Sequence, residues 1–325
     1  MEYVKLGNTG MEVSKLCLGC MGFGEPERGR EKWSIGEAES REVIKKALDS
    51  GINFFDTANL YSAGSSEEIV GKALKDFANR DEIVLASKLY FPMFDGPNAK
   101  GLSRKSIFAE IDHSLKRLQT DYLDLYIIHR WDYGTPIEET MEALHDLVKM
   151  GKVRYIGASS MHAWQFAKAQ FIAEKNGWTK FVSMQNLYNL LYREEEREMI
   201  PLLQDQNVAM TPWSPLAGGR LTRDIGAITA RASQAVQADL PAYIVASDNE
   251  VISRVHKLAD ERGITRGQVA TAWMLSKDYV TAPLIGATKV NYLDDALGAF
   301  EVALSAEEIK YLEEAYVPRN ITGYR

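Results

Sequence analysis

Residues 123–129 read LDLYIIH, a mostly apolar run that stops at His129. The same pattern recurs along the chain: a short apolar run meets a polar residue or a glycine, and a helical stretch follows. Short, bounded apolar runs are typical of buried parallel strands. The eight runs are Leu16 to Gly19, Ile52 to Phe55, Ile83 to Ala86, Leu123 to Ile128, Val153 to Ala158, Phe181 to Met184, Val208 to Pro212 and Ala282 to Ile285.

The segments between the runs have helical periodicity. Ser103 is placed to cap a helix whose apolar stripe is Ile107, Ile111, Leu115 and Leu118. Residues 65–68 and 135–138 each have the form of a capping box. Successive strand ends lie about 30 to 40 residues apart, the length of one strand-helix unit. Eight such units predict an α/β fold, a (β/α)8 barrel.

Three segments fall outside the repeat. Residues 2–15 read as a β-hairpin that turns at Asn8-Thr9-Gly10 and would cap the lower end of the barrel. Residues 220–247 form a long polar loop, and long loops in compact domains are usually functional. Residues 306–316 predict a final amphipathic helix. With no low-complexity linker, we expect residues 1–325 to form a single domain.

Composition excludes several classes of protein. The 325 residues carry 38 Lys and Arg against 45 Asp and Glu, a net charge of -7, which argues against a nucleic-acid binder. Apolar runs are too short for a membrane helix, and MEYVKLGNTG has no signal-peptide core, so we expect a cytoplasmic protein. Cys17 and Cys20 could be a redox pair, but a strand here would point them to opposite faces. No metal site is predicted.

Active sites of (β/α)8 barrels lie where the strands end. Asp56, Lys88 and His129 end three successive runs, and Tyr61 follows the first of them. A lysine cation lowers the pKa of a nearby tyrosine, and a paired carboxylate keeps the lysine charged. A histidine can donate a hydrogen bond to a substrate oxygen. Each residue alone has a structural explanation, but together they suit proton transfer at a carbonyl oxygen, with a redox cofactor supplying the hydride.

These strand ends also carry a family resemblance. Residues 55–61, 86–88 and 127–130 resemble the catalytic segments of the aldo-keto reductase superfamily. Residues 154–160 and 185–189 are similar to its carboxamide-binding segments, and residues 212–219 to its pyrophosphate loop. The similarity runs from residue 2 to residue 316. Residues 17–24 and 129–133 look closest to the bacterial YajO-type subgroup.

The resemblance implies an NADPH-dependent reductase of aldehydes or ketones. Tyr61 would donate the proton, with its pKa lowered by Lys88 and Asp56, and His129 would orient the carbonyl. Thr288 and Lys289 would receive the 2′-phosphate that distinguishes NADP from NAD. The residues implied at the cofactor are Gly19, Cys20, Met21, Asp56, Ser159, Ser160, Gln185, Trp213, Ser214, Pro215, Leu216, Gly218, Gly219, Arg220, Leu221, Ile285, Gly286, Thr288, Lys289 and Asp295.

The sequence indicates the substrate pocket less precisely than the cofactor site. Plausible pocket walls, which flank or precede the catalytic segments, are Trp33, Tyr90, Phe91, Trp131 and Tyr133. We expect a small carbonyl substrate and favour a monomer. Two alternatives stay open: a binding module that senses NADP(H) with slow turnover, and a Schiff-base lyase that uses Lys88. The second is disfavoured because pairing with Asp56 would keep the lysine protonated.

Overall fold

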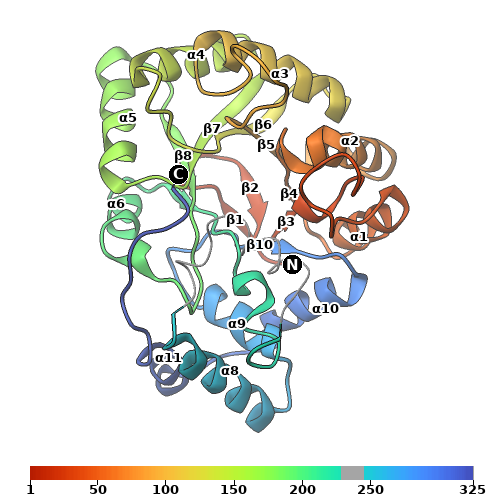
Figure 1. The fold of residues 1–325 in the computed structure, drawn as a ribbon, viewed down its shortest axis with the longest axis vertical. Helices are drawn as coiled ribbons and strands as arrows, with labels where there is room; N and C mark the ends of the chain where they lie inside the picture. The colour runs from red at the N-terminus through yellow and green to blue at the C-terminus, as the bar shows by residue number, and fades with distance from the viewer. Residues whose placement is uncertain (228–244, 325) are drawn as a thin grey trace.

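The computed structural model of the chain describes residues 1–227 and 245–324, and within these residues eight parallel strands form the centre of the molecule (Figure 1). Their order in the sheet is β10-β3-β4-β5-β6-β7-β8-β9, so chain neighbours are sheet neighbours. The strands are β3 (Cys17–Gly19), β4 (Phe54–Asp56), β5 (Val84–Leu89), β6 (Leu123–Ile128), β7 (Val153–Ser159), β8 (Phe181–Gln185), β9 (Ala209–Met210) and β10 (Leu284–Gly286).

Backbone hydrogen bonds close the sheet into a barrel. Leu284 N–H donates to the Pro212 carbonyl at 2.9 Å, and Thr281 N–H donates to the Met210 carbonyl at 2.9 Å. These bonds join β10 and the residues just before it to β9 and the residues just after it. The predicted (β/α)8 barrel is confirmed, and each of the eight predicted runs contains or overlaps one strand.

Helices surround the strands (Figure 1). Their inner faces bury apolar side chains against the outside of the barrel, which is the usual source of stability for amphipathic helices. The helices are α1 (Glu37–Asp49), α2 (Ser65–Phe77), α3 (Arg104–Leu118), α4 (Ile137–Lys149), α5 (Ala163–Asn176), α6 (Met199–Asp205), α8 (Asp248–Arg262), α9 (Arg266–Leu275), α10 (Val290–Gly298) and α11 (Ala306–Glu313). No helix in the described ranges is both long and apolar enough to cross a membrane.

Helix caps agree with the sequence only in part. Ser103 caps α3 by accepting a hydrogen bond from Ser106 N–H, as predicted. The two predicted capping boxes were wrong, because neighbouring loops take the hydroxyl groups. Ser65 donates to the Ser62 carbonyl at 2.8 Å, and Thr135 donates to the Asp132 carboxylate at 2.8 Å.

The predicted hairpin is present as β1 (Tyr3–Lys5) and β2 (Glu12–Ser14), which pair antiparallel. Leu6 and Val13 pack inside the barrel with side chains from the N-terminal ends of the strands, such as Phe54. Gly7 has φ +57°, and an added Cβ would lie 2.7 Å from the backbone nitrogen of Ala209. The hairpin therefore closes the lower end of the barrel by direct backbone contact.

Both cysteines are buried free thiols, in different apolar clusters. Burial raises the pKa of Cys17 and of Cys20 above the usual value. A buried thiol with a raised pKa forms little thiolate and is unreactive. Packing is therefore favoured over a redox role, although only Cys17 lies on a strand, and Cys20 begins the turn η1 (Cys20–Gly22). Of the predicted loop 220–247, residues 228–244 lie outside the described residues.

Candidate active site

Lys88 lies at the centre of the cluster predicted from the strand ends. Its ammonium nitrogen donates to the Asp56 carboxylate, to the Thr57 carbonyl at 2.9 Å and to the Tyr61 hydroxyl at 3.2 Å. These bonds engage all three N–H groups of the ammonium. Lys88 is 0% exposed and Asp56 1%, so the cation and its carboxylate form a buried pair. The structure thus brings three predicted catalytic residues into direct contact.

Tyr61 is held by a tight turn, η2 (Tyr61–Gly64), in which Ser62 and Ala63 have φ of 46° and 50°. Left-handed conformations are costly for residues other than glycine, and they occur where surrounding structure enforces them. Here Glu31 accepts the Ser62 N–H at 3.0 Å. A Cβ added to Gly29 would meet Ser62 Cα at 2.4 Å, so the loop before α1 presses directly on the turn. That loop therefore holds the backbone of the turn directly after Tyr61.

His129 follows β6 and lies beside Tyr61, with ring centres 5.9 Å apart. Its Nδ1 atom is buried and has no hydrogen-bond partner in the described part of the chain. Burial, together with the charges of Arg130 and Lys88, holds the pKa of His129 well below its usual value of 6.5. The imidazole is therefore neutral at pH 7, and a neutral imidazole can donate one hydrogen bond.

The electrostatics of the pair correct one expectation. Burial disfavours the Lys88 cation, but Asp56 and Tyr61 outweigh burial and raise the pKa of Lys88. Burial also raises the pKa of Tyr61 above 10, and Lys88 offsets that rise only in part because the Asp56 charge opposes it. Lys88 lowers the pKa of Tyr61 as expected, but the predicted lowering by Asp56 and the predicted net lowering were wrong. The hydroxyl keeps its proton at neutral pH and can act as an acid.

A second group of predicted residues lies across the barrel from Lys88. Gln185, at the end of β8, donates to the Asp56 carboxylate at 2.9 Å. Ser159 donates to the Gln185 carbonyl at 2.8 Å, and the Trp213 indole donates to Ser160 at 3.2 Å. The predicted carboxamide and ring-stacking residues are thus bonded to one another and, through Gln185, to the catalytic cluster.

The first and last strands of the barrel, β3 and β10, are neighbours on a third side. Gly19 of β3 and Gly286 of β10 are partners in the parallel register. A Cβ on Gly22 would lie 3.0 Å from Thr288 and 3.1 Å from Trp33. Trp33 therefore lies against the predicted cofactor segments. Three further predicted residues there are the half-buried Met21, the exposed Lys289, directly before α10, and the half-buried Asp295 within it.

The predicted pyrophosphate loop has an unusual backbone. Four residues around η5 (Ala217–Gly219) have positive φ: Ser214, Ala217, Gly218 and Gly219. The Gly218 N–H donates to the Ser214 hydroxyl at 3.1 Å, a bond that stabilises this turn. Arg220 bonds Asp248, a fully buried carboxylate, at 2.8 Å. The side chains of Cys20, Pro215, Leu221 and Ile285 are buried, while that of Leu216 is half-buried.

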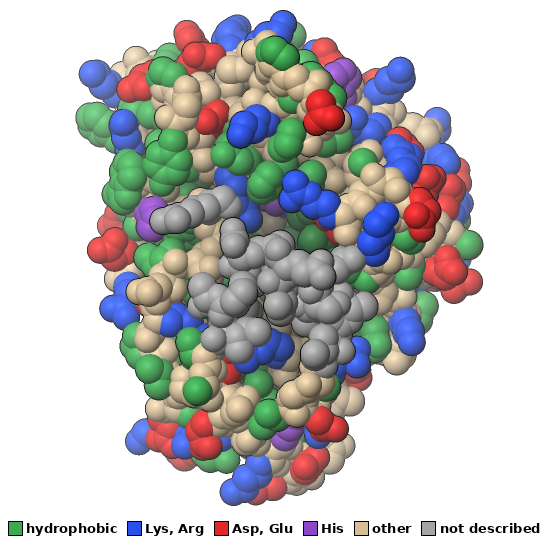
Figure 2. Space-filling model, in the orientation of Figure 1, with side chains coloured by type: hydrophobic (Ala, Val, Ile, Leu, Met, Phe, Trp, Pro, Cys, Tyr) green, Lys and Arg blue, Asp and Glu red, His purple; other side chains and the backbone are tan. Residues whose placement is uncertain are grey.

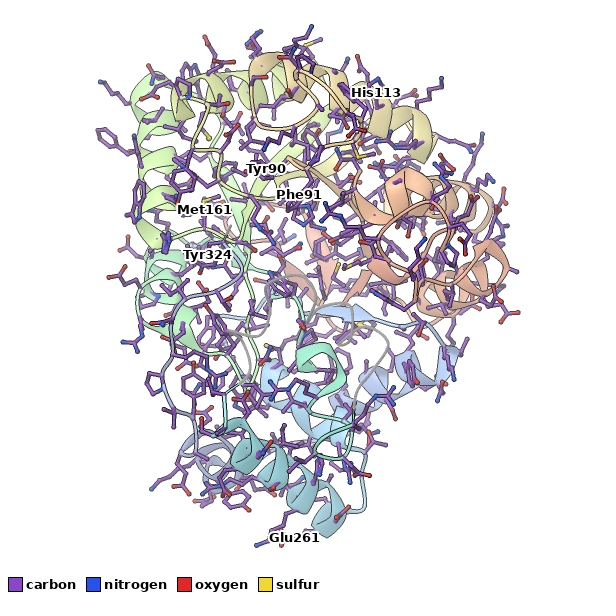
Figure 3. The ribbon with its side chains drawn as sticks, viewed as in Figure 1. Tyr90, Phe91, His113, Met161, Glu261 and Tyr324 are labelled. Carbon is purple, nitrogen blue, oxygen red and sulfur yellow. The ribbon has the colours of Figure 1, made fainter. Side chains whose placement is uncertain are left out.

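The predicted pocket walls separate into groups. Phe91 packs edge-on against His129 with ring centres 5.0 Å apart, and Tyr90 packs against Phe91 at 5.2 Å. Trp131 is buried beside Trp164. Tyr133 is 72% exposed, and its hydroxyl accepts a hydrogen bond from Gln165. In Figure 3, Tyr90 and Phe91 lie over the central part of the barrel, whereas His113 and Glu261 lie at its periphery.

Comparison with known proteins agrees with this geometry. Residues 15–317 match the model of the Aldo/keto reductase family. The chain belongs to this family. It is 46% identical to versiconal hemiacetal acetate reductase of Aspergillus parasiticus, over 99% of this chain and 98% of that protein. It is 47% identical to a putative aryl-alcohol dehydrogenase of Schizosaccharomyces pombe, over 99% and 97% of the two chains. These relatives are fungal and give no support to the predicted bacterial YajO-type subgroup.

This aldo/keto reductase also places residues at the site that no prediction included. Glu195 of η4 (Glu194–Glu196) is buried, accepts from the Asn186 amide and from the Tyr324 hydroxyl, and has its pKa raised to about 7 by burial. Tyr324 packs edge-on against His162 at 4.9 Å. Asn186 lies in the segment 185–189 that resembles a carboxamide-binding segment, but it was not among the residues implied at the cofactor. No motif marks the C-terminal residues 317–324.

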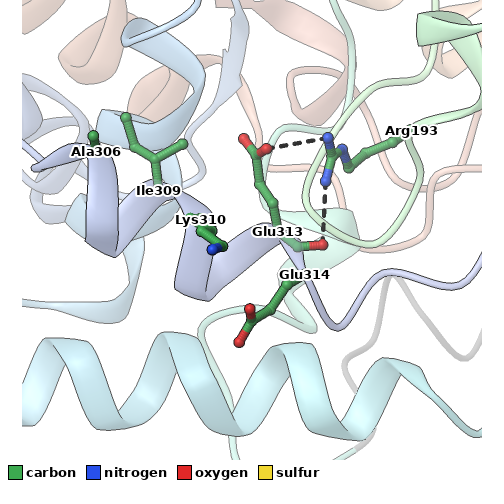
Figure 4. Close-up of a pocket in the computed structure, with 6 residues that line it drawn as sticks. All are labelled: Arg193, Ala306, Ile309, Lys310, Glu313 and Glu314. Atoms are coloured by element: carbon green, nitrogen blue, oxygen red, sulfur yellow. Dashed lines mark hydrogen bonds and ion pairs between the residues drawn. The ribbon is translucent and has the colours of Figure 1, made fainter.

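The aldo/keto reductase also has a surface pocket away from the strand ends. It lies along α11 and is lined by Arg193, Ala306, Ile309, Lys310, Glu313 and Glu314 (Figure 4). Arg193 forms an ion pair with Glu313 across it at 3.2 Å. None of these residues was predicted for the site, and the ion pair serves to fix α11. On the face drawn in Figure 2, acidic and basic side chains are interspersed around the outer edge of the molecule.

Proposed function

We propose that this aldo/keto reductase reduces aldehydes or ketones to alcohols with NADPH, and that Tyr61 delivers the proton. One observation carries the proposal: Lys88 bonds both the Asp56 carboxylate and the Tyr61 hydroxyl in a buried site at the strand ends. The naming of the fungal relatives as a reductase and an aryl-alcohol dehydrogenase supports the same class of reaction.

The residues present fit a nicotinamide dinucleotide. Amide and hydroxyl groups of Ser159, Gln185 and Asn186 gather near the half-buried ring of Trp213. The small residues Gly218 and Gly219 would let the backbone approach a phosphate closely. Thr288 and Lys289 precede α10, whose N-terminus favours an anion. When bound, the reduced nicotinamide supplies a hydride to the carbonyl carbon.

Residues of the protein donate the proton that the carbonyl oxygen receives. The carbonyl oxygen accepts hydrogen bonds from the Tyr61 hydroxyl and from neutral His129. As negative charge develops on that oxygen, the Tyr61 O–H bond breaks and the proton passes to the new alcohol. The resulting phenolate lies next to the Lys88 cation, 3.2 Å away in the resting site. Asp56 keeps Lys88 charged throughout, so the cation needs no rearrangement during the step.

The Schiff-base alternative is disfavoured by the same contacts. A nucleophilic lysine must lose its proton, but the pKa of Lys88 is raised, despite the opposing effect of burial, by Asp56 and Tyr61. Borohydride treatment in the presence of a carbonyl compound should therefore leave the mass of the peptide that contains Lys88 unchanged. A sensing role with slow turnover would show as tight NADPH binding with negligible turnover.

The test uses 4-nitrobenzaldehyde and NADPH with deuterium at the transferred position of C4. We expect NADPH oxidation and an alcohol that carries deuterium on its carbinol carbon. No oxidation with any aldehyde of a broad panel would contradict the proposal.

A substitution at Lys289 tests the proposed preference for NADPH over NADH. Lys289→Ala should lower kcat/KM with NADPH far more than with NADH, since it removes a cation from the proposed 2′-phosphate site. The matched control is Lys45→Ala, a surface lysine of α1 that pairs with Asp49. Equal losses with both cofactors in Lys289→Ala would contradict the assignment.

A further inference from the structure

Arg130 is a cation of the candidate site that has no carboxylate partner among the described residues. It follows His129 directly, and its guanidinium donates to the His129 carbonyl at 2.6 Å. Its Nε atom is buried and has no hydrogen-bond partner within residues 1–227 and 245–324. An arginine side chain has five N–H donors, so Arg130 has donors available for a ligand.

The position of Arg130 is defined by the aromatic wall. Its guanidinium carbon lies 5.5 Å from the ring centre of Phe91, and Phe91 packs against His129 at 5.0 Å. Burial raises the pKa of Tyr61, Tyr90 and Tyr324, and the Arg130 charge opposes the rise in all three. The cation therefore acts on phenols that come from three separate segments of the site.

Arg130 is carried by a different strand from the proposed cofactor residues. It follows β6, and Phe91 follows β5, whereas most of the proposed cofactor residues follow β7, β8, β9, β10 and β3. A cofactor phosphate is therefore a poor candidate partner. Arg130 is half-buried, with its Nε atom shielded from solvent. Partial desolvation of a guanidinium without a counter-ion among the described residues is costly, and stacking on an aromatic ring offsets that cost only in part. The missing anion is best supplied by the substrate.

We propose that Arg130 binds a carboxylate carried by the carbonyl substrate. The fork of the guanidinium matches a carboxylate, and Phe91 beside it suits an aromatic body. The favoured substrates are then aromatic aldehydes with a carboxylate on the ring. This inference rests on the proposed function, because it names the substrate class of the same reaction.

The experiment compares 2-, 3- and 4-formylbenzoate with their three methyl esters, using NADPH as reductant. For wild type, at least one isomer should be reduced with a kcat/KM about tenfold or more above that of its ester, the size expected of a charge-assisted bond. Benzoate should inhibit more strongly than benzamide. These measurements need no variant and so do not depend on how a variant folds.

Variants then assign the preference to the residue. Arg130→Gln should lower the carboxylate-to-ester ratio about tenfold or more, and Arg130→Lys should retain part of it, since a charge remains without the fork. Arg154→Gln is the matched control, because Arg154 also stacks on an aromatic ring, that of Tyr122, but is exposed near the start of β7, whereas the proposed site lies at the strand ends. Its ratio should equal that of wild type.

The experiment distinguishes a failure of the Arg130 inference from a failure of the proposed function. If the esters are reduced as well as the carboxylates by wild type, or if Arg130→Gln keeps the wild-type ratio, the inference is overturned while the reductase proposal stands. If neither carboxylates nor esters support NADPH oxidation, the proposed function itself fails.

Discussion

The Gln185 side chain donates a 2.9 Å hydrogen bond to the carboxylate oxygen of Asp56 that does not face Lys88. Asp56 is therefore satisfied from two sides, by β5 and by β8. This bond links the segment proposed to hold the nicotinamide amide to the group that keeps Lys88 charged. Gln185 is thereby a positioning residue for the catalytic pair as well as a proposed cofactor residue.

Removing that bond should destabilise the protein without any ligand. We expect Gln185→Leu to lower the free energy of unfolding by about 1–3 kcal/mol, because a buried carboxylate oxygen loses its donor. Urea unfolding of the cofactor-free protein measures this. Gln206→Leu is the control, since Gln206 is half-buried and accepts only a 3.3 Å bond from Gln170. Equal stability of Gln185→Leu and wild type would show that the bond is unimportant.

The pH dependence of reduction should be flat across the neutral range. His129 is neutral because its pKa lies well below 6.5, so it gains a proton only in more acidic solution. Tyr61 has a pKa above 10, so it keeps its proton until strongly alkaline pH. We therefore expect kcat/KM for a neutral aldehyde to be constant from about pH 6.5 to about pH 9. The profile is best measured in Glu195→Gln, where the Glu195 titration is absent. A remaining inflection near pH 6.5 would contradict the state assigned to His129.

Glu195 should make stability depend on pH. Its pKa rises from 4.5 to about 7 on burial, so the folded state binds more protons than the unfolded state between these values. Stability therefore falls as pH rises through this window, by about 3 kcal/mol for this group. In Glu195→Gln that fall should disappear from urea unfolding series at pH 5 and pH 8. Glu198→Gln, an exposed neighbour, should behave like wild type. An unchanged pH dependence in Glu195→Gln would show that this carboxyl titrates normally.

The sequence was sufficient for the parts of the molecule that repeat. Each buried strand shows as an apolar run, and Asp56, Lys88 and His129 are found because parallel strands all end at one face. The capping boxes failed because the hydroxyls of Ser65 and Thr135 had competing partners in loops that the local sequence does not reveal.

Contacts between distant segments could not be predicted in this way. The pressure of Gly29 on the Tyr61 turn and the bond of Tyr324 to Glu195 join residues 33 and 129 positions apart. The raised pKa of Tyr61 depends on the balance between burial and a lysine whose charge Asp56 largely offsets, and that balance follows only from the three-dimensional arrangement.

The central claim, that Tyr61 donates the proton, is tested most directly by comparing Tyr61→Phe with Tyr126→Phe. The Tyr126 hydroxyl is buried on β6 and has no hydrogen-bond partner in the described part of the chain, so its removal should leave kcat within about twofold of wild type. Tyr61→Phe should lower kcat for aldehyde reduction by about 10²-fold or more while NADPH binding persists. A Tyr61→Phe protein that binds NADPH and retains the wild-type kcat would contradict the account.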